Sequence, residues 1–176
     1  MSRSAATGVH DDSMRRRLFA ALWLPEPVSA AIEEIHRKDQ VGVRFVVPEN
    51  WHVTLRFFGD AHPGEIGAAL DDVRFAPTTV RLGPAVDVDA RRRTLFVPAT
   101  GADDLAAEVV GATRQLGTEA IRPRYLGHVT LARLKKGATM PRALGTLVDA
   151  SWDPTEVALV ESTLRPDGAR YHTVQT

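Results

Sequence analysis

The chain has 176 residues, a length that suits one domain with a substantial core or two small lobes that share one. Its 22 Lys and Arg residues balance 22 Asp and Glu residues, so no overall basic field recruits a long polyanion, and any nucleic-acid contact must rely on local arginine clusters. It has no cysteine, which excludes disulfides, thiolate nucleophiles and cysteine-ligated metal sites and fits a reducing cytoplasm.

The first residues are small, polar and without periodicity. We expect residues 1–14 to form a disordered extension ahead of a single bilobed domain, residues 15–176. Arginines 15–17 and the apolar run Leu18–Leu24 faintly resemble a signal peptide, but the run is short and Pro25 ends it. We therefore predict a cytoplasmic protein. No stretch approaches the roughly 20 apolar residues of a membrane span.

The first half of the chain alternates strand and helix patterns. It predicts, in order, a strand, a helix, two strands and a second helix, at residues 18–24, 25–35, 43–47, 51–58 and about 66–73. Pro25 and Pro27 suit the first turn of the first helix, where a backbone N–H has no partner in any case. Gly59-Asp60 is predicted to end the strand at 51–58.

The second half continues the alternation. It predicts strands at 78–89, 93–98, 126–134, 156–164 and 169–174, and helices at 102–116 and 141–148. Pro166-Asp167-Gly168 is a hairpin turn signal between the last two strands. The element order predicts an α+β fold, bilobed and duplicated about a pseudo-two-fold axis, in which antiparallel β-sheets form a central cleft with helices on the outside.

One tetrad occurs twice: the His-Val-Thr-Leu of residues 52–55 returns unchanged at residues 128–131. Side chains alternate between the faces of a strand, so each tetrad puts His and Thr on one face and Val and Leu on the other. A single copy would be an ordinary strand, but two identical copies in so short a chain indicate matched half-sites. A pseudo-two-fold axis would place the two histidines on opposite sides of a bound group.

The groups in the tetrads suit acid–base chemistry at phosphorus. The chain has no Gly-x-Ser-x-Gly turn and no Walker-type phosphate loop, and each tetrad supplies only one metal-ligand side chain. An in-line displacement needs one group to take a proton and another to give one, and histidine, with a reference pKa of about 6.5, does both near neutral pH. The threonine hydroxyls can donate to phosphate oxygens.

The sequences around both tetrads, residues 50–59 and 127–133, resemble the two signatures of the 2H phosphoesterase superfamily. More closely, the chain resembles the bacterial and archaeal RNA 2′,3′-cyclic phosphodiesterases, also called 2′-5′ RNA ligases. Further matches lie at residues 17–22, 47–50, 161–164 and 168–171, so that the resemblance spans residues 16–175.

The resemblance implies hydrolysis of RNA 2′,3′-cyclic phosphate ends to 2′-phosphomonoesters, without a metal site or cofactor, and a reverse 2′-5′ ligation as a side reaction. Nothing in the sequence suggests an obligate interface, so we expect a monomer. In that scheme His52 is the proton donor and His128 the proton acceptor. Thr54 and Thr130 bind phosphate. The implied partner is an RNA or oligonucleotide end with a 2′,3′-cyclic phosphate, and neither a membrane nor an obligate protein partner is implied.

Two further positions carry over as candidate substrate-binding residues, Arg133 and Phe19. Simple alternation predicts that Arg133 faces away from His128, so a binding role requires a bulge or twist. Phe19 is at least as well explained as a core residue of the first strand. Trp51 is expected in the core.

The remaining histidines and the arginine clusters are weaker candidates for the functional site. We expect solvent exposure for His10 and His36, a helix-start position for His62, and a position away from the cleft for His172. Solvated turn charge explains Arg91–Arg93, Arg122 and Arg124 better than an RNA path does. Two rival functions stay open: a 2H esterase for a small cyclic phosphate, such as an ADP-ribose or nucleoside derivative, and a non-catalytic nucleotide-binding module.

Overall fold

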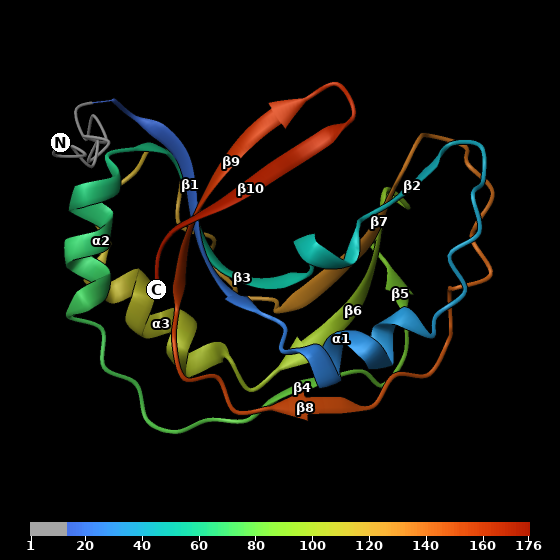
Figure 1. The fold of residues 1–176 in the computed structure, drawn as a ribbon, viewed down its shortest axis with the longest axis horizontal. Coiled ribbons are helices and arrows are strands. Elements are labelled where there is room, and N and C mark those ends of the chain that lie inside the picture. The colour runs from blue at the N-terminus through green and yellow to red at the C-terminus, as the bar shows by residue number, and fades with distance from the viewer. Residues whose placement is uncertain (1–13) are drawn as a thin grey trace, which may run out of the picture.

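The structure, a computed structural model, describes residues 14–176 as a mixed α+β fold (Figure 1). The strands are β1 (Arg16–Trp23), β2 (Val43–Phe45), β3 (His52–Ala61), β4 (Val80–Leu82), β5 (Asp87–Val88), β6 (Thr94–Thr100), β7 (His128–Leu134), β8 (Ala150–Trp152), β9 (Ala158–Arg165) and β10 (Gly168–Gln175). The helices are α1 (Glu26–Glu33), α2 (Pro63–Asp71) and α3 (Asp103–Ala112), with a short 3₁₀ turn, η1 (Pro48–Asn50).

The strands pair in the order β10-β9-β1-β3-β7-β6-β4-β8, with β2 added to β7 and β5 to β6. Every pair is antiparallel. At the centre β3 pairs with β7, and each of them has a second neighbour in its own half of the chain, β1 and β6 respectively. The predicted α+β class and the duplicated antiparallel arrangement are confirmed.

The main core fills one face of this sheet. Alternate residues of the central strands point into it, among them Leu22, Val53, Val97 and Leu131. Helix α3 packs on β3 and α2 packs on α3, whereas α1 contacts β8 (Figure 1). The opposite face carries a smaller cluster of Phe19, Ala21, Ala158 and Val160, onto which Trp23 and Tyr171 pack.

Most predicted strands differ from the structure by one to three residues at an end, and two of the differences have a clear cause. Gly59-Asp60 does not end the third strand, because Gly59 and Asp60 continue the pairing of β3 with β1 as far as Ala61. The strand predicted at 78–89 is two short strands, since Gly83-Pro84 interrupts the pattern. At Gly83 φ is +128°, and a Cβ would lie 2.1 Å from the carbonyl oxygen of Val148, so only glycine permits this approach.

The helix predicted at 141–148 does not form. Backbone groups of this segment bond across to another segment instead: the Gly145 N–H donates to the Val86 carbonyl and the Val148 N–H to the Pro84 carbonyl. Gly145 also has a φ of +82°, outside the helical range. The segment leads into β8, which the sequence pattern did not reveal and which pairs with β4.

The closing hairpin formed as predicted, with β9 and β10 joined at residues 166–167. The predicted disordered extension lies outside the described residues except for Met14, which is exposed. Between residues 14 and 176 no helix is long and apolar enough to cross a membrane.

Candidate active site

The two tetrads lie side by side in the centre of the sheet. Val53 of β3 is directly opposite Val129 of β7, and both side chains are fully buried. Neighbouring residues point to the other face, so this register sets the first histidine beside the second threonine and the second histidine beside the first threonine. All four polar side chains are half-buried. We call this surface the histidine face.

This arrangement brings together His52, Thr54, His128 and Thr130, the residues that the sequence singled out. It differs from the expected facing strands, because the two motifs are neighbours in one sheet. Two hollows of about 440 and 310 Å³ occur in the fold, the smaller one beside Trp23, and neither histidine lines them.

Both imidazoles are oriented in the same way by the backbone. Nδ1 of His52 lies 2.7 Å from the carbonyl oxygen of Asn50, and Nδ1 of His128 lies 2.9 Å from that of Leu126. A carbonyl oxygen only accepts, so in each ring Nδ1 carries the hydrogen and Nε2 is left for other chemistry. Each acceptor stands two residues before its histidine, which makes the two half-sites equivalent.

The surroundings of the two rings differ. His52 contacts three aromatic rings, with centroid distances of 4.9 Å to Phe19, 5.5 Å to Trp23 and 5.3 Å to Tyr171. His128 contacts only the ring of Phe96 among the described residues, at 5.4 Å. The two half-sites share a backbone geometry but not an environment.

Burial among these rings lowers the pKa of His52 to about 4, because the protonated imidazole loses hydration there. The hydrogen bond to Asn50 opposes this change, and the positive charges of His128 and Arg133 add to it. In the free protein His52 is therefore neutral at neutral pH. Burial also raises the pKa of the neighbouring Tyr171 hydroxyl.

The threonine hydroxyls complete the polar surface. In the described part of the chain, neither Thr54 nor Thr130 has a hydrogen-bonding partner for its hydroxyl group. Each stands two residues after its histidine and faces the same side. Two free hydroxyls between two oriented imidazoles form a compact set of donors for the oxygens of a tetrahedral anion.

A β-bulge in each central strand changes which residues reach the histidine face. In β7, Thr130 pairs with Phe96 but Ala132 pairs with Leu95, so Leu131 is an extra residue. Both Leu131 and Ala132 are consequently buried, and Arg133 is exposed on the face of His128. The bulge that a binding role for Arg133 requires is therefore present, although strict alternation by itself does not anticipate it.

The same bulge occurs at the equivalent place in β3, where Leu55 is the extra residue. It buries Arg56 and returns Phe57 to the histidine face, 41% exposed. Phe57 and Arg133 therefore occupy matching positions, five residues after their histidines. Their cross-strand partners match as well: Phe57 pairs with Phe19, and Arg133 pairs with Thr94.

The two ends of the histidine face thus differ in chemistry. At one end the rings of Phe57 and Phe19 lie 5.9 Å apart, and the Arg122 guanidinium lies 5.7 Å from the Phe57 centroid. At the other end Nη1 of Arg133 donates to Oγ1 of Thr94 over 2.8 Å. One end is aromatic and the other is basic.

The remaining predicted residues fall as follows. Phe19 is a core residue, 2% exposed, and it also lies at the site, because its ring contacts the His52 ring. Trp51 is in the core, His36 is exposed and His62 begins α2, as expected. His10 lies outside the described residues.

Sequence reasoning missed two residues beside His52. Trp23 is directly opposite His52 in the pairing of β1 with β3, and Tyr171 reaches it from β10. His172 alternates with Tyr171 and pairs with Glu161. Tyr171 belongs to the matched segment 168–171, which was the available signal, but only the pairing of β9 with β1 brings that hairpin to His52.

The turn arginines are all exposed, as the solvated-charge interpretation expects. They are Arg91, Arg92, Arg93, Arg122 and Arg124. Of these, Arg122 approaches the histidine face over the Phe57 ring. Among residues 14–176 no group of three or more His, Asp or Glu side chains is placed to hold a metal ion.

A duplicated antiparallel α+β sheet whose two central strands present paired His and Thr defines a phosphoesterase of the two-histidine class. The family described as LigT-like phosphoesterase matches residues 22–85, which include the first tetrad. An RNA 2′,3′-cyclic phosphodiesterase of Thermus thermophilus is 33% identical, over 88% of this chain and 86% of its own length. The chain belongs to the LigT-like phosphoesterase family.

Other relatives and solved structures agree with this assignment. An RNA 2′,3′-cyclic phosphodiesterase of Aeropyrum pernix is 29% identical, over 76% of this chain and 85% of its own length. A crystal structure of a Thermus thermophilus protein has a TM-score of 0.74 at 31% identity and covers 90% of this chain and 95% of its own. Escherichia coli LigT complexed with 3′-AMP has a TM-score of 0.71 at 25% identity and covers 92% and 96%.

Proposed function

We propose that this protein hydrolyses RNA 2′,3′-cyclic phosphate ends to 2′-phosphomonoesters. The observation that carries the proposal is the pair of imidazoles, each with Nδ1 bound to a backbone carbonyl, on one surface with two threonine hydroxyls that have no partner within residues 14–176. Relatives named RNA 2′,3′-cyclic phosphodiesterase support the substrate class.

In the proposed reaction the cyclic phosphate lies between the two Nε2 atoms. Nε2 of His128 takes a proton from water as the water oxygen attacks phosphorus. The bond between phosphorus and the 3′ oxygen breaks, and Nε2 of His52 gives its proton to that oxygen. The products are a 3′ hydroxyl and a 2′-phosphomonoester, and one proton transfer from His128 back to His52 through solvent restores the site.

Negative charge builds on the non-bridging oxygens during this displacement. The hydroxyls of Thr54 and Thr130 donate to those oxygens, and the Arg133 guanidinium adds positive charge at the same face. The bulge at Leu131 supports the role of Arg133, because it turns that side chain toward His128.

The donor role of His52 requires it to bind a proton that its surroundings disfavour. Its pKa is about 4, chiefly because of burial, and the nearby charge of Arg133 also lowers it. An anionic phosphate beside the His52 ring offsets the Arg133 charge and favours the protonated imidazole. We therefore propose that His52 takes up its proton together with the substrate.

The same site can carry out ligation. If the 5′ hydroxyl of a second strand replaces water as the group that attacks the cyclic phosphate, the displacement leaves a 2′-5′ linkage and a free 3′ hydroxyl. His128 would take the proton of the 5′ hydroxyl and His52 would again protonate the 3′ oxygen. We propose this as a side reaction of the monomeric enzyme in the cytoplasm.

The deciding experiment is a turnover assay with EDTA present. An oligonucleotide ending in 2′,3′-cyclic phosphate and an ADP-ribose cyclic phosphate are offered separately, and products are separated by chromatography. We expect the oligonucleotide to yield a 2′-phosphate end. Preference for the ADP-ribose compound would favour the small-molecule esterase, binding without turnover would favour a non-catalytic module, and loss of activity with EDTA would contradict the side-chain mechanism.

A further inference from the structure

A second arginine stands beside Arg133 on the histidine face. Strand β2 pairs with the end of β7, and Arg44 is directly opposite Arg133. Its neighbours Val43 and Phe45 pack against the main core, so the exposed Arg44 side chain projects from the other face. Residues directly opposite in an antiparallel pair have Cβ atoms about 5 Å apart, so the two side chains leave the sheet side by side, with Nη1 of Arg133 turned toward Thr94 of β6.

Neither guanidinium is neutralised within the described residues. Arg44 has no ion pair there, and Arg133 has only the hydrogen bond to the Thr94 hydroxyl. Asp89 is the carboxylate whose pKa Arg133 helps to lower, but its Oδ1 accepts the backbone N–H groups of Arg93 and Thr94. Adjacent like charges on a sheet destabilise it, so an unneutralised pair indicates a site for an external anion.

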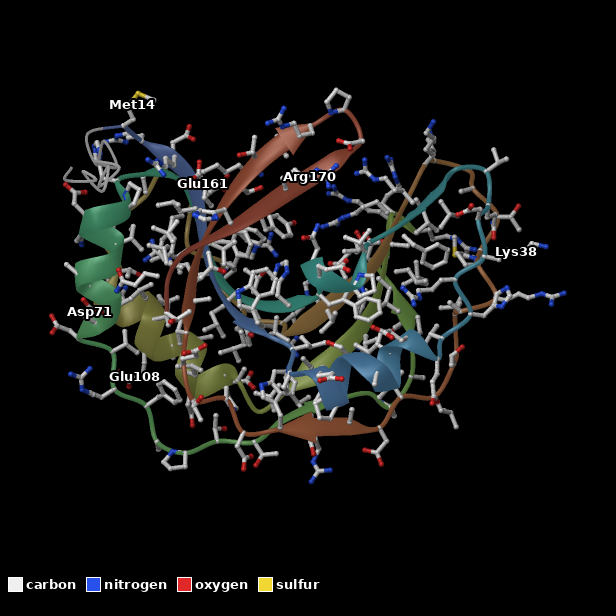
Figure 2. All side chains as sticks on the ribbon, in the orientation of Figure 1. Met14, Lys38, Asp71, Glu108, Glu161 and Arg170 are labelled. Atoms are coloured by element: carbon white, nitrogen blue, oxygen red, sulfur yellow. The ribbon has the colours of Figure 1, made fainter. Side chains whose placement is uncertain are left out.

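Arg133 and Arg44 form a row of two arginines that runs from the histidines toward the β9–β10 hairpin. A Cβ on Gly168, in that hairpin, would lie 3.7 Å from Nη1 of Arg44, so the turn backbone closes the outer end of the row. Asn50, just before His52, donates to the Ala169 carbonyl over 3.3 Å and ties the hairpin to the catalytic strand. Figure 2 places Arg170 on this same hairpin, where it pairs with Asp167.

The opposite direction along the histidine face suits a different part of a substrate. There the surface is formed by the rings of Phe57, Phe19 and Tyr171, with the Arg122 guanidinium over the Phe57 ring, so it offers mainly aromatic contact. Aromatic rings suit the stacking of a base, whereas the adjacent Arg133 and Arg44 match two successive phosphates of a strand.

We infer that Arg44 binds the phosphodiester that precedes the terminal nucleotide, which makes an oligonucleotide, rather than a nucleoside cyclic phosphate, the preferred substrate. This inference rests on the proposed function. The reacting phosphate lies at the histidines and Arg133, and the next phosphate of the strand lies at Arg44, one strand further out in the sheet.

The test compares a nucleoside 2′,3′-cyclic phosphate with a dinucleotide that ends in the same cyclic phosphate. We expect the wild-type protein to have the higher kcat/KM on the dinucleotide, and Arg44→Gln to reduce that preference about tenfold, as loss of one charged hydrogen bond does. Arg44→Lys should keep most of it. Arg81→Gln is the matched control, an exposed arginine of β4 that pairs with β8 and leaves the preference unchanged.

Binding supplies a readout that does not need turnover. The affinity for the product dinucleotide with a 2′-phosphate end is measured at several salt concentrations, and Arg44→Gln should lower the slope of log K against log salt by about 0.7, the value for one phosphate of a single strand. Equal losses on both substrates, or an unchanged slope, would overturn the inference. A reduced slope in a protein that hydrolyses neither substrate would uphold the Arg44 site and contradict the proposed function instead.

Discussion

Val53 lies directly opposite Val129, and this one pair determines the geometry of the candidate active site. It is the single register pair between β3 and β7. A one-residue slip of either strand against the other would turn the histidine of that strand into the core and its valine out to solvent. Because the two valines are fully buried, that slip is strongly disfavoured, and the histidines are held on one face by packing that lies behind them.

Replacing either histidine should remove activity while the fold persists. We expect His52→Ala and His128→Ala each to lower kcat on a cyclic-phosphate end by a factor of about 10² to 10⁴, because each removes one proton-transfer group. His36→Ala, at an exposed position, is the control. Steady-state kinetics and thermal unfolding measured on the same samples separate a chemical loss from a folding loss, and residual activity near wild type in either variant would contradict the two-histidine mechanism.

The pKa of His52 should depend on occupancy of the site. In the free protein, NMR titration of the ring is expected to give a value of about 4, since burial penalises the protonated ring. With a nucleoside 2′-phosphate bound, the pKa should rise, and binding should take up a proton from a buffer near neutral pH. A His52 pKa that is the same with and without the nucleotide would rule out substrate-coupled protonation.

The same pKa change has a consequence for stability. The folded pKa of His52 lies below its unfolded value of about 6.5, so the unfolded chain binds more protons between these values. The stabilising contribution of neutral His52 is present above about pH 6.5 and is lost as the pH falls toward 4. Because glutamine cannot be protonated, the free energy of unfolding of His52→Gln, measured with urea, should fall less steeply with pH across this window than that of the wild-type protein. An identical pH dependence in both proteins would contradict the link between the pKa of His52 and stability.

Much of this site could be predicted from the sequence because strand alternation is a local property. The sequence of each tetrad was enough to predict that His and Thr lie on one face of the strand and Val and Leu on the other. The partners of His52 are different, because Trp23 and Tyr171 reach it only through the pairing of β1 with β3 and of β9 with β10. The register of these strand pairings is set by the whole sheet.

The bulges explain why strict alternation misplaces Arg133. Leu131 adds one residue to β7, and every side chain beyond it changes face, so Arg133 joins the site. Nothing in the local sequence marks this point, since both bulge residues are leucines that suit a regular strand. The helix expected at 141–148 failed for a related reason, because backbone bonds to Val86 and Pro84 outweigh its local propensity.

Arg56 should matter for stability rather than for binding. The bulge at Leu55 buries it to 6% exposure, and its guanidinium donates to the Thr113 carbonyl and hydroxyl and, over 2.9 Å, to the Leu116 carbonyl. Arg56→Met leaves these acceptors at the end of α3 unpaired, so we expect a loss of about 3 kcal/mol in the free energy of unfolding. The exposed Arg81→Met should change it by less than about 0.5 kcal/mol. Urea denaturation of both variants measures this difference. Equal losses of stability in the two variants would show that the buried contacts of Arg56 contribute nothing.

Arg133 should act on both the phosphate and His52. Removing its charge in Arg133→Ala is expected to lower kcat/KM about tenfold to a hundredfold, because the reacting phosphate loses a cation. The same change should raise the pKa of His52 in the free protein, since the Arg133 charge helps to depress it. Thr94→Val removes only the hydroxyl that holds Nη1 of Arg133, and it should leave the His52 pKa unchanged and reduce kcat/KM by less. If Arg133→Ala instead leaves both the rate and the pKa of His52 unaltered, the side chain has no part in the site, and the bulge at Leu131 serves packing alone.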